Sequence, residues 1–334
     1  MLIAVAGCSK NTASTHPTPS TSSPSSTATP TATPPVVLSL QWSYQLTRIT
    51  NTDSFDGVAV DSAGNVFVAD VAKDRLLKLD SKGKLLASWG SKGSAPGRFN
   101  SILPDQGNET ARGLVLALAP NGNLYVADPG NSRIQEFDVQ GRFIRQWGGA
   151  GSAGGQFVRI FALAIDRNGI IYAVDDRARD YTVKTFDQSG KYLSNWGPKE
   201  GQQDQLDESV GIPAVSAGGD IYFPSFARDL VLKFSTAGAF EASFPPAAPP
   251  GSPGGFLHAG DVGIGTNGDV FVVDTGGARI QEYAPQGPFV RSLAGPAAGP
   301  GHLVKPQEVV FDALGNVYVF DDSTYRLLKF SPPA

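Results

Sequence analysis

A stretch of about 50 residues recurs six times along this chain, and this repeat limits the possible folds more than any other feature. Each copy contains a short apolar run that ends in a polar residue, as in NVFVAD, NLYVAD and DIYFPS. These runs end at Asp70, Asp128, Asp175, Ser225, Asp274 and Asp321. Repeats of roughly this length are typical of the blades of a β-propeller.

The copy from Leu114 to Gly148 shows what one repeat contains. It has four short extended runs, separated by turns at Asn121-Gly122 and Gln140-Gly141. Glycine accepts a positive φ without steric cost, so these turns suit antiparallel neighbours. A four-stranded sheet of this kind has two apolar faces and needs a copy on each side. The sequence therefore predicts an all-β fold, a six-bladed β-propeller with four-stranded antiparallel blades.

The ends of the chain suggest how the ring closes. The fourth run ends in a large apolar residue in five copies, namely Trp89, Trp147, Trp196, Phe244 and Leu293, but the sixth copy has no fourth run. Residues 36–42, VVLSLQW, have no repeat of their own, and Leu38 and Trp42 reproduce the spacing of Leu85 and Trp89. We predict that this N-terminal strand completes the last blade, which leaves no exposed edge in the ring.

The motif D-x-x-N-x-R-I-Q-x-F, which runs from Asp128 to Phe137, resembles the NHL repeat family, as do W-G-S-x-G and G-x-F before the next blade. The resemblance covers residue 36 to the C-terminus and is weakest in the fourth copy, where Ser225 and Leu230 replace Asp and Arg. It implies a six-bladed propeller. The family includes binding modules, extracytoplasmic sensor domains and a few lyases, so the resemblance leaves activity open.

The N-terminal segment predicts a location. Residues 5–8, VAGC, resemble the lipobox of bacterial lipoproteins, in which the cysteine receives a lipid. We interpret residues 1–8 as the remnant of a signal peptide with Cys8 as the lipidation site; the alternative is a chance cysteine. Residues 9–35 are mostly Ser, Thr, Pro and Ala and should form a disordered tether, and residues 36–334 form the propeller. We therefore expect an extracytoplasmic monomer, lipid-anchored to a bacterial membrane only through Cys8.

Composition excludes several classes of function. The net charge is −4 and no run of Lys or Arg exists, which argues against a nucleic-acid partner. A single cysteine excludes an internal disulfide framework and a cysteine-based zinc site. Gly149, Gly151 and Gly154 match the dinucleotide fingerprint, but no helix follows them, so we interpret them as an interblade connection and expect no cofactor.

Two sets of mostly charged residues recur at fixed positions in the repeats. Asp and Arg recur five positions apart at Asp70/Arg75, Asp128/Arg133, Asp274/Arg279 and Asp321/Arg326, and repetition in most blades indicates a structural tie rather than catalysis. A second column lies three residues before each innermost strand, at Ser54, Arg112, Arg159, Ser209, His258 and Lys305. Arg177, Arg179 and Arg228 lie in loops that should open on the same face.

Such a ring of cations would favour an anionic ligand, although nearby acidic residues could neutralise it. These are Asp105, Glu109, Asp176, Asp180 and Asp229. The long loop from Ser91 to Ala111, with Phe99, Ile102 and Leu103, should then determine specificity. The predicted function is a non-catalytic binding module for an anionic cell-envelope polymer or a protein partner.

The alternative is an enzyme. Metal-assisted lyases of the peptidyl-amidating type resemble this chain in blade pattern but bring several histidines to the axis, whereas here only His258 and His302 are available. Asp261 and Glu308, at equivalent places in adjacent blades, are weak candidates for a calcium-like ion; otherwise they are solvated carboxylates at the mouth of the channel. A metal-assisted lyase or hydrolase using His258, Asp261 and Glu308 thus stays open, as does a purely structural scaffold.

Overall fold

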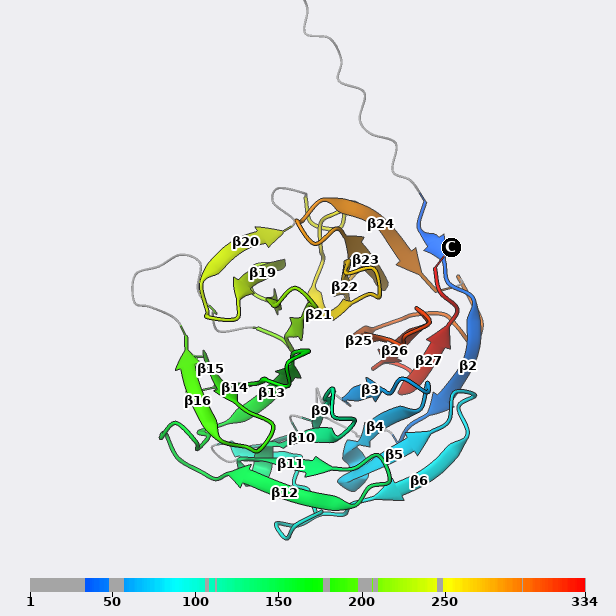
Figure 1. The fold of residues 1–334 in the computed structure, drawn as a ribbon. Helices are drawn as coiled ribbons and strands as arrows, with labels where there is room; N and C mark the ends of the chain where they lie inside the picture. Colours follow the sequence, from blue (N-terminus) through cyan, green and yellow to red (C-terminus); the bar gives the residue numbers. More distant parts are fainter. Residues whose placement is uncertain are drawn as a thin grey trace, which may run out of the picture. The chain divides into compact units, whose positions relative to one another are not determined.

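Six sheets stand around a central axis in the computed structural model (Figure 1), which confirms the predicted six-bladed β-propeller. The structure describes residues 34–47, 57–105, 108–111, 113–176, 181–197, 206, 210–244, 249–295 and 297–333. In these residues no helix has the length and apolar character of a membrane span.

In blades 1 to 5 the strands follow the order of the chain from the innermost to the outermost, whereas the outermost strand of blade 6 comes from the N-terminus. Blade 1 contains β3 (Val58–Val60), β4 (Val66–Asp70), β5 (Arg75–Leu79) and β6 (Leu85–Trp89). Blade 2 contains β9 (Val115–Leu118), β10 (Leu124–Asp128), β11 (Arg133–Phe137) and β12 (Phe143–Gly148). Blade 3 contains β13 (Ile160–Ile165), β14 (Ile171–Asp176), β15 (Tyr181–Phe186) and β16 (Tyr192–Trp196).

The second half of the ring repeats this order. Blade 4 contains β17 (Ala214–Val215), β18 (Asp220–Ser225), β19 (Leu230–Ser235) and β20 (Phe240–Phe244). Blade 5 contains β21 (Ala259–Ile264), β22 (Val270–Asp274), β23 (Arg279–Tyr283) and β24 (Phe289–Ala294). Blade 6 contains β25 (Pro306–Phe311), β26 (Val317–Asp321), β27 (Arg326–Phe330) and the N-terminal β2 (Leu40–Gln45).

The core lies between neighbouring blades. The middle strands are apolar on both faces, and β10 is buried along its whole length, whereas the outer strand β12 is largely exposed. Between blades 1 and 2, for example, Phe67 and Leu76 pack with Leu124 and Phe137. Because each sheet buries both faces only when it has two neighbours, the ring is the arrangement that satisfies every blade.

In blades 1, 2 and 3 a tryptophan at the end of the outer strand packs against the last turn of the next blade. A Cβ atom at Gly141, in the last turn of blade 2, would lie 2.6 Å from the ring of Trp89 in blade 1. The same contact recurs at Gly190 with Trp147 and at Gly238 with Trp196. These glycines also have positive φ, so the turn and the ring contact both require a residue without a side chain.

The N-terminal strand closes the ring, as predicted. Strand β2 pairs antiparallel with β27, with Trp42 opposite Lys329 and Gln45 opposite Arg326. The strand pairing is shifted by two residues from the predicted register, although the Trp42 ring contacts Gly83 as the Trp89 ring contacts Gly141. Leu85 and Trp89 pair with the last and second residues of β5, and the equivalent places in blade 6 belong to Leu40 and Tyr44.

Residues 36–38 belong to a different sheet from the one predicted. Strand β1 (Val36–Val37) pairs in parallel with β24, as a fifth strand on the outer edge of blade 5. The Leu38 amide donates to the Ala294 carbonyl at 2.8 Å, and the Leu38 side chain is buried between blades 5 and 6. The N-terminal segment therefore joins two blades, because β24 offers an edge that β1 can cover.

Candidate functional site

The loop face of the ring is the end of the blades that carries the interblade connections and the loops between second and third strands. The repeated aspartates hold these connections in place. Asp128 accepts hydrogen bonds from the Asn100 amide at 2.8 Å and from Arg133 Nε at 2.8 Å. Arg133 in turn donates to the carbonyls of Ser94, Ala95 and Arg98, which lie in the connection from blade 1.

The predicted Asp–Arg ties are confirmed in blades 1, 2 and 5, each with an Nε–Oδ2 distance of 2.8 Å. The prediction is wrong in blade 6, where Arg326 Nε donates to Gln45 Oε1 at 3.2 Å because the closing strand lies alongside it. Blade 3 has no arginine at this place, and the buried Lys184 contacts Asp175 at 2.8 Å instead. The column is a structural tie that fixes the loop face.

The glycine-rich stretch after blade 2 is an interblade connection, as predicted. The Gly149 amide donates to the Ser132 carbonyl at 2.7 Å, and the Gly151 amide donates to the Phe157 carbonyl at 3.0 Å. The loop leads directly to Phe157, which is buried between blades 2 and 3. Its amides are therefore used within the fold.

The predicted cation column occupies one structural position in the blades where it is described. The carbonyls of Arg159, His258 and Lys305 each accept the amide of the residue after the repeated aspartate, at 2.9 to 3.0 Å. Arg112, Arg177 and Arg179 lie outside the described residues, as do Ser54 and Ser209. Arg228 is described and exposed on the same face.

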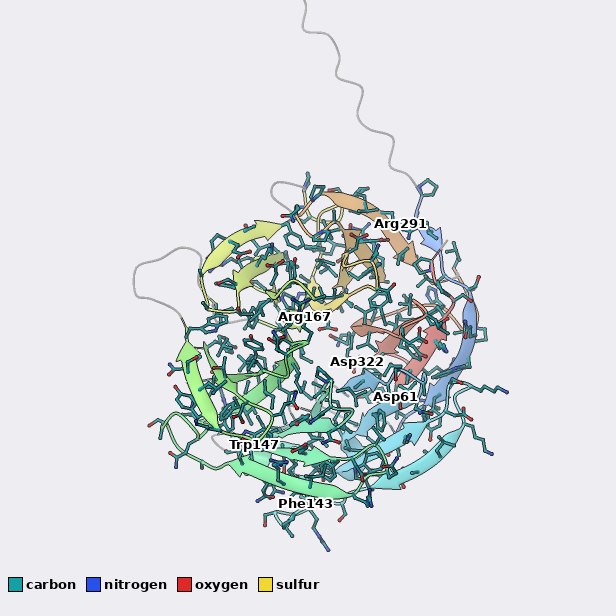
Figure 2. All side chains as sticks on the ribbon, viewed as in Figure 1. Asp61, Phe143, Trp147, Arg167, Arg291 and Asp322 are labelled. Atoms are coloured by element: carbon teal, nitrogen blue, oxygen red, sulfur yellow. The ribbon has the colours of Figure 1, made fainter. Side chains whose placement is uncertain are left out.

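The side chains of this column have partners within the fold. Arg159 forms an ion pair with Asp176, and Lys305 Nζ lies 2.7 Å from Asp322 Oδ2 (Asp322 is labelled in Figure 2). The His258 ring stacks on Phe226, with ring centroids 5.3 Å apart. Arg159 and Lys305 are thus each paired with an acid that directly follows the repeated aspartate.

Sequence reasoning missed the residues that precede these three. Val158, Leu257 and Val304 come directly before Arg159, His258 and Lys305, and they are 44, 52 and 44% exposed. An aliphatic side chain therefore stands beside a polar one in three blades. We call these six residues the rim. A signal was present in the sequence, since the three aliphatic residues share one offset from the repeated aspartate.

In the long loop between blades 1 and 2, the prediction is wrong for one residue. Phe99, a proposed specificity residue, is fully buried between blades 1 and 2. It occupies the place of Phe157 and Phe256 in later connections, where an apolar residue fills the gap between blades. Ile102 and Leu103 lie in β7 (Ile102–Asp105), which pairs with β8 (Asn108–Ala111) as a two-stranded hairpin.

A channel of about 340 Å³ runs along the axis and is lined by residues of all six blades. Asp261 and Glu308 both line it, which confirms that they occupy equivalent places. Glu308 Oε1 accepts the Val58 amide at 2.9 Å, and Asp261 Oδ2 accepts the Val309 amide at 3.0 Å. Each carboxylate therefore bonds to the innermost strand of the next blade.

The interpretation of these acids as solvated groups is wrong, because both are buried. Burial raises the pKa of Asp261 from an ordinary 3.8 to about 7, since the charged form loses its hydration. The amides of Val309 and Val262 act in the opposite direction but are the smaller effect.

The residues proposed for an enzyme are divided between two places. His258 lies exposed on the loop face against Phe226, whereas Asp261 and Glu308 lie inside the channel. His302 is also exposed. In the part of the chain that the structure describes, no three His, Cys, Asp or Glu side chains are placed to share a metal ion.

The opposite end of the blades, the turn face, carries the turns between first and second strands. A cavity of about 550 Å³ lies there beside blades 1 to 3, and Asp61 and Arg167 are among its lining residues (both labelled in Figure 2). Asp61 Oδ1 accepts the amides of Ala63 and Asn65, so this carboxylate holds its own turn. No residue proposed from the sequence lines this cavity.

Ring, rim and channel together define the chain as a six-bladed β-propeller with an acidic axial channel. No family model matches it. Protein brain tumor of Drosophila melanogaster is 30% identical over 82 residues, which cover 25% of this chain and 8% of that protein. Peptidyl-glycine alpha-amidating monooxygenase B of Xenopus laevis is 32% identical over 124 residues, which cover 36% of this chain and 13% of that protein.

Solved structures extend the similarity to nearly the whole ring. A streptogramin B lyase has a TM-score of 0.55 at 11% identity, covering 87% of this chain and 97% of the lyase. A protein of unknown function from Bacteroides thetaiotaomicron has a TM-score of 0.59 at 12% identity, covering 89% of this chain and 75% of that protein. These likenesses support a six-bladed propeller family and show the fold alone. The curated relatives are matched over only a small part of their length.

Proposed function

We propose that this protein is an NHL-type propeller that binds a protein partner on its loop face, outside the cytoplasm, while a lipid on Cys8 anchors it to a bacterial membrane. The rim is the observation that carries the proposal. Residues on a propeller that are exposed and apolar, at one repeated position beside polar groups, form the kind of mixed surface that protein interfaces use.

The rim favours a protein over an anionic polymer. A polyanion would need cations available for several contacts, but Arg159 and Lys305 are already paired with Asp176 and Asp322. The exposed Val158, Leu257 and Val304 would gain from being covered by apolar side chains of a partner. We therefore infer a partner segment that combines apolar side chains with a few polar groups.

The rim is also preorganised, which lowers the entropic cost of binding. Asp274 Oδ1 accepts the Leu257 amide at 2.8 Å, and Asp321 Oδ2 accepts the Val304 amide at 2.7 Å. The backbone beneath two of the exposed aliphatic residues is thus fixed by buried carboxylates.

Site-specific photo-crosslinking in intact cells tests this function. A photoreactive phenylalanine analogue at position 257 should give a discrete cross-linked product with one protein. The matched control is position 314. Leu314 is 80% exposed and lies in a turn of blade 6 on the turn face, at the opposite end of the ring from position 257. No product at 257, or the same product at 257 and 314, would refute a specific loop-face partner.

The anionic-polymer alternative has its own test. If an acidic envelope polymer binds the rim, replacing Arg159 and Lys305 together by alanine should weaken a salt-sensitive interaction with that polymer. If this variant still bound the polymer equally well, Arg159 and Lys305 would not be the residues that bind it.

The anchor is tested separately. Cys8→Ser should release the protein from the membrane fraction and abolish incorporation of a labelled fatty acid. A variant that stays in the membrane fraction and still incorporates label would contradict anchoring through Cys8, and it would leave the rim proposal untouched.

An enzymatic alternative is a metal-assisted lyase or hydrolase with its site at the axis, and one of the similar solved structures is a streptogramin B lyase. The separation of His258 from Asp261 and Glu308 gives this alternative less support than the rim gives to binding.

A further inference from the structure

One oxygen of Asp261 has no partner inside the protein. Asp261 is 3% exposed, and its Oδ2 accepts the Val309 amide, but its Oδ1 is buried without a hydrogen bond. Buried polar atoms are almost always bonded in folded proteins, because an unmade hydrogen bond costs about 1–3 kcal/mol. Asp261 also lines the axial channel, so its unbonded oxygen points to a missing donor.

The surroundings of Asp261 restrict the kind of donor. Its equivalents in blades 1 to 4 are Gly57, Val115, Ala162 and Ile212, none of which is charged. The other channel-lining residues are apolar apart from Glu308, and in the described chain Asp261 and Glu308 are the only titratable groups of this lining. No ion pair of Asp261 is present among the described residues, so the channel holds an acidic group without a cationic partner between aliphatic walls.

The volume of the channel fits a small organic molecule. About 340 Å³ lies at the lower end of the range for small-molecule pockets, which are mostly apolar with a few placed polar groups. A divalent metal ion would need several more oxygen ligands than Asp261 and Glu308 supply. An anion would find no cationic side chain in this lining.

We propose that the axial channel binds a small organic ammonium ion, whose N–H group donates to Asp261 Oδ1 while its hydrocarbon part packs against the aliphatic walls. A charge-assisted hydrogen bond to a desolvated carboxylate would orient the ligand, and burial of the hydrocarbon part would add affinity. This site goes beyond the proposed partner binding, because it uses the inside of the ring and not the rim.

Isothermal titration calorimetry with n-butylammonium, n-butanol and calcium chloride as probes tests the site. Butylammonium should bind at about pH 8, and at least about tenfold more weakly to Asp261→Asn, since the amide keeps the shape but removes the charge. Lowering the pH to about 6 should also weaken binding to the unmodified protein, because a proton then competes for Asp261. Asp80→Asn, a change in a turn of blade 1 outside the channel, is the control and should bind as the unmodified protein does.

Four results would overturn the proposal: no binding of butylammonium, equal binding by Asp261→Asn, equal binding of n-butanol, or binding of calcium alone. The last result would make the channel a metal site. Circular dichroism of Asp261→Asn establishes that the variant is folded. Failure here leaves the crosslink at position 257 unaffected, so the two proposals fail independently.

Discussion

Replacing Asp261 by asparagine is expected to stabilise the protein at about pH 8 and to have little effect at about pH 5. Burial raises the pKa of the folded carboxyl to about 7, so the folded state takes up this proton before the unfolded state does. The free energy of unfolding therefore rises as the pH falls from about 8 towards 4. Above about pH 7 the buried, charged carboxylate lowers it.

The size of the effect follows from the same pKa. A rise from 3.8 to about 7 corresponds to about 4 kcal/mol, at about 1.4 kcal/mol per pH unit, when Asp261 is fully ionised. Asparagine removes this cost and keeps an oxygen for the Val309 amide. Its NH₂ group lacks an acceptor where Oδ1 now lies, which costs about 1–3 kcal/mol. The net gain at pH 8 is therefore about 1–3 kcal/mol.

Urea denaturation, followed by tryptophan fluorescence at both pH values, measures this difference. Asp80→Asn is the matched control, because backbone amides of Lys84 and Lys82 hold the pKa of the exposed Asp80 carboxyl below its usual value. A lowered pKa stabilises the folded state above about pH 4, so this variant should not change the slope between pH 5 and 8. An equal effect of Asp261→Asn at both pH values would refute the reasoning.

Two further predictions concern the repeated motifs. Asp128→Ala should destabilise the protein by about 3–5 kcal/mol in urea denaturation, because the buried Arg133 guanidinium loses its carboxylate; a loss below about 1 kcal/mol would contradict the tie. Gly141→Ala should lower the free energy of unfolding by about 2–4 kcal/mol, since φ is +84° and a tryptophan ring lies 2.6 Å from the added Cβ. Gly122 has a similar φ of +82° but no atom near the added Cβ, so Gly122→Ala should lower it by only about 1 kcal/mol. Equal losses of Tm for the two glycine variants would show that the ring contact is unimportant.

The fold was predictable because most blades use the same residue types at the same structural positions. The aspartate that ends the second strand holds the interblade connection, and the glycine of the last turn accommodates a tryptophan ring. An aspartate ends the second strand in five of the six copies, and the spacing of these residues revealed the number of blades. The register of the closing strand was not predictable from spacing, because Leu38 and Trp42 imitate a pair that Leu40 and Tyr44 form.

The sequence predicted where the candidate site residues lie, but not which of them form ion pairs or are buried. Spacing placed Arg159 and Lys305 on one face, but their pairing with Asp176 and Asp322 depends on loop geometry that no linear pattern contains. The burial of Asp261 had a signal, since its counterparts in blades 1 to 4 are glycine or apolar residues. Comparing that column would have predicted a buried carboxylate.

Closure of the ring by residues 40–45 is the claim on which rim and channel both depend. The most direct measurement is disulfide formation between β2 and β27 in a Cys8→Ser background, with Gln45→Cys and Arg326→Cys as the pair, because these residues are opposite and their side chains touch at 3.2 Å. Mass spectrometry without reductant should show a monomer that has lost two hydrogens, while the offset pair Ser43→Cys with Arg326→Cys should stay reduced. A reduced Gln45/Arg326 pair, or a cross-link found only between two chains, would contradict closure within one molecule.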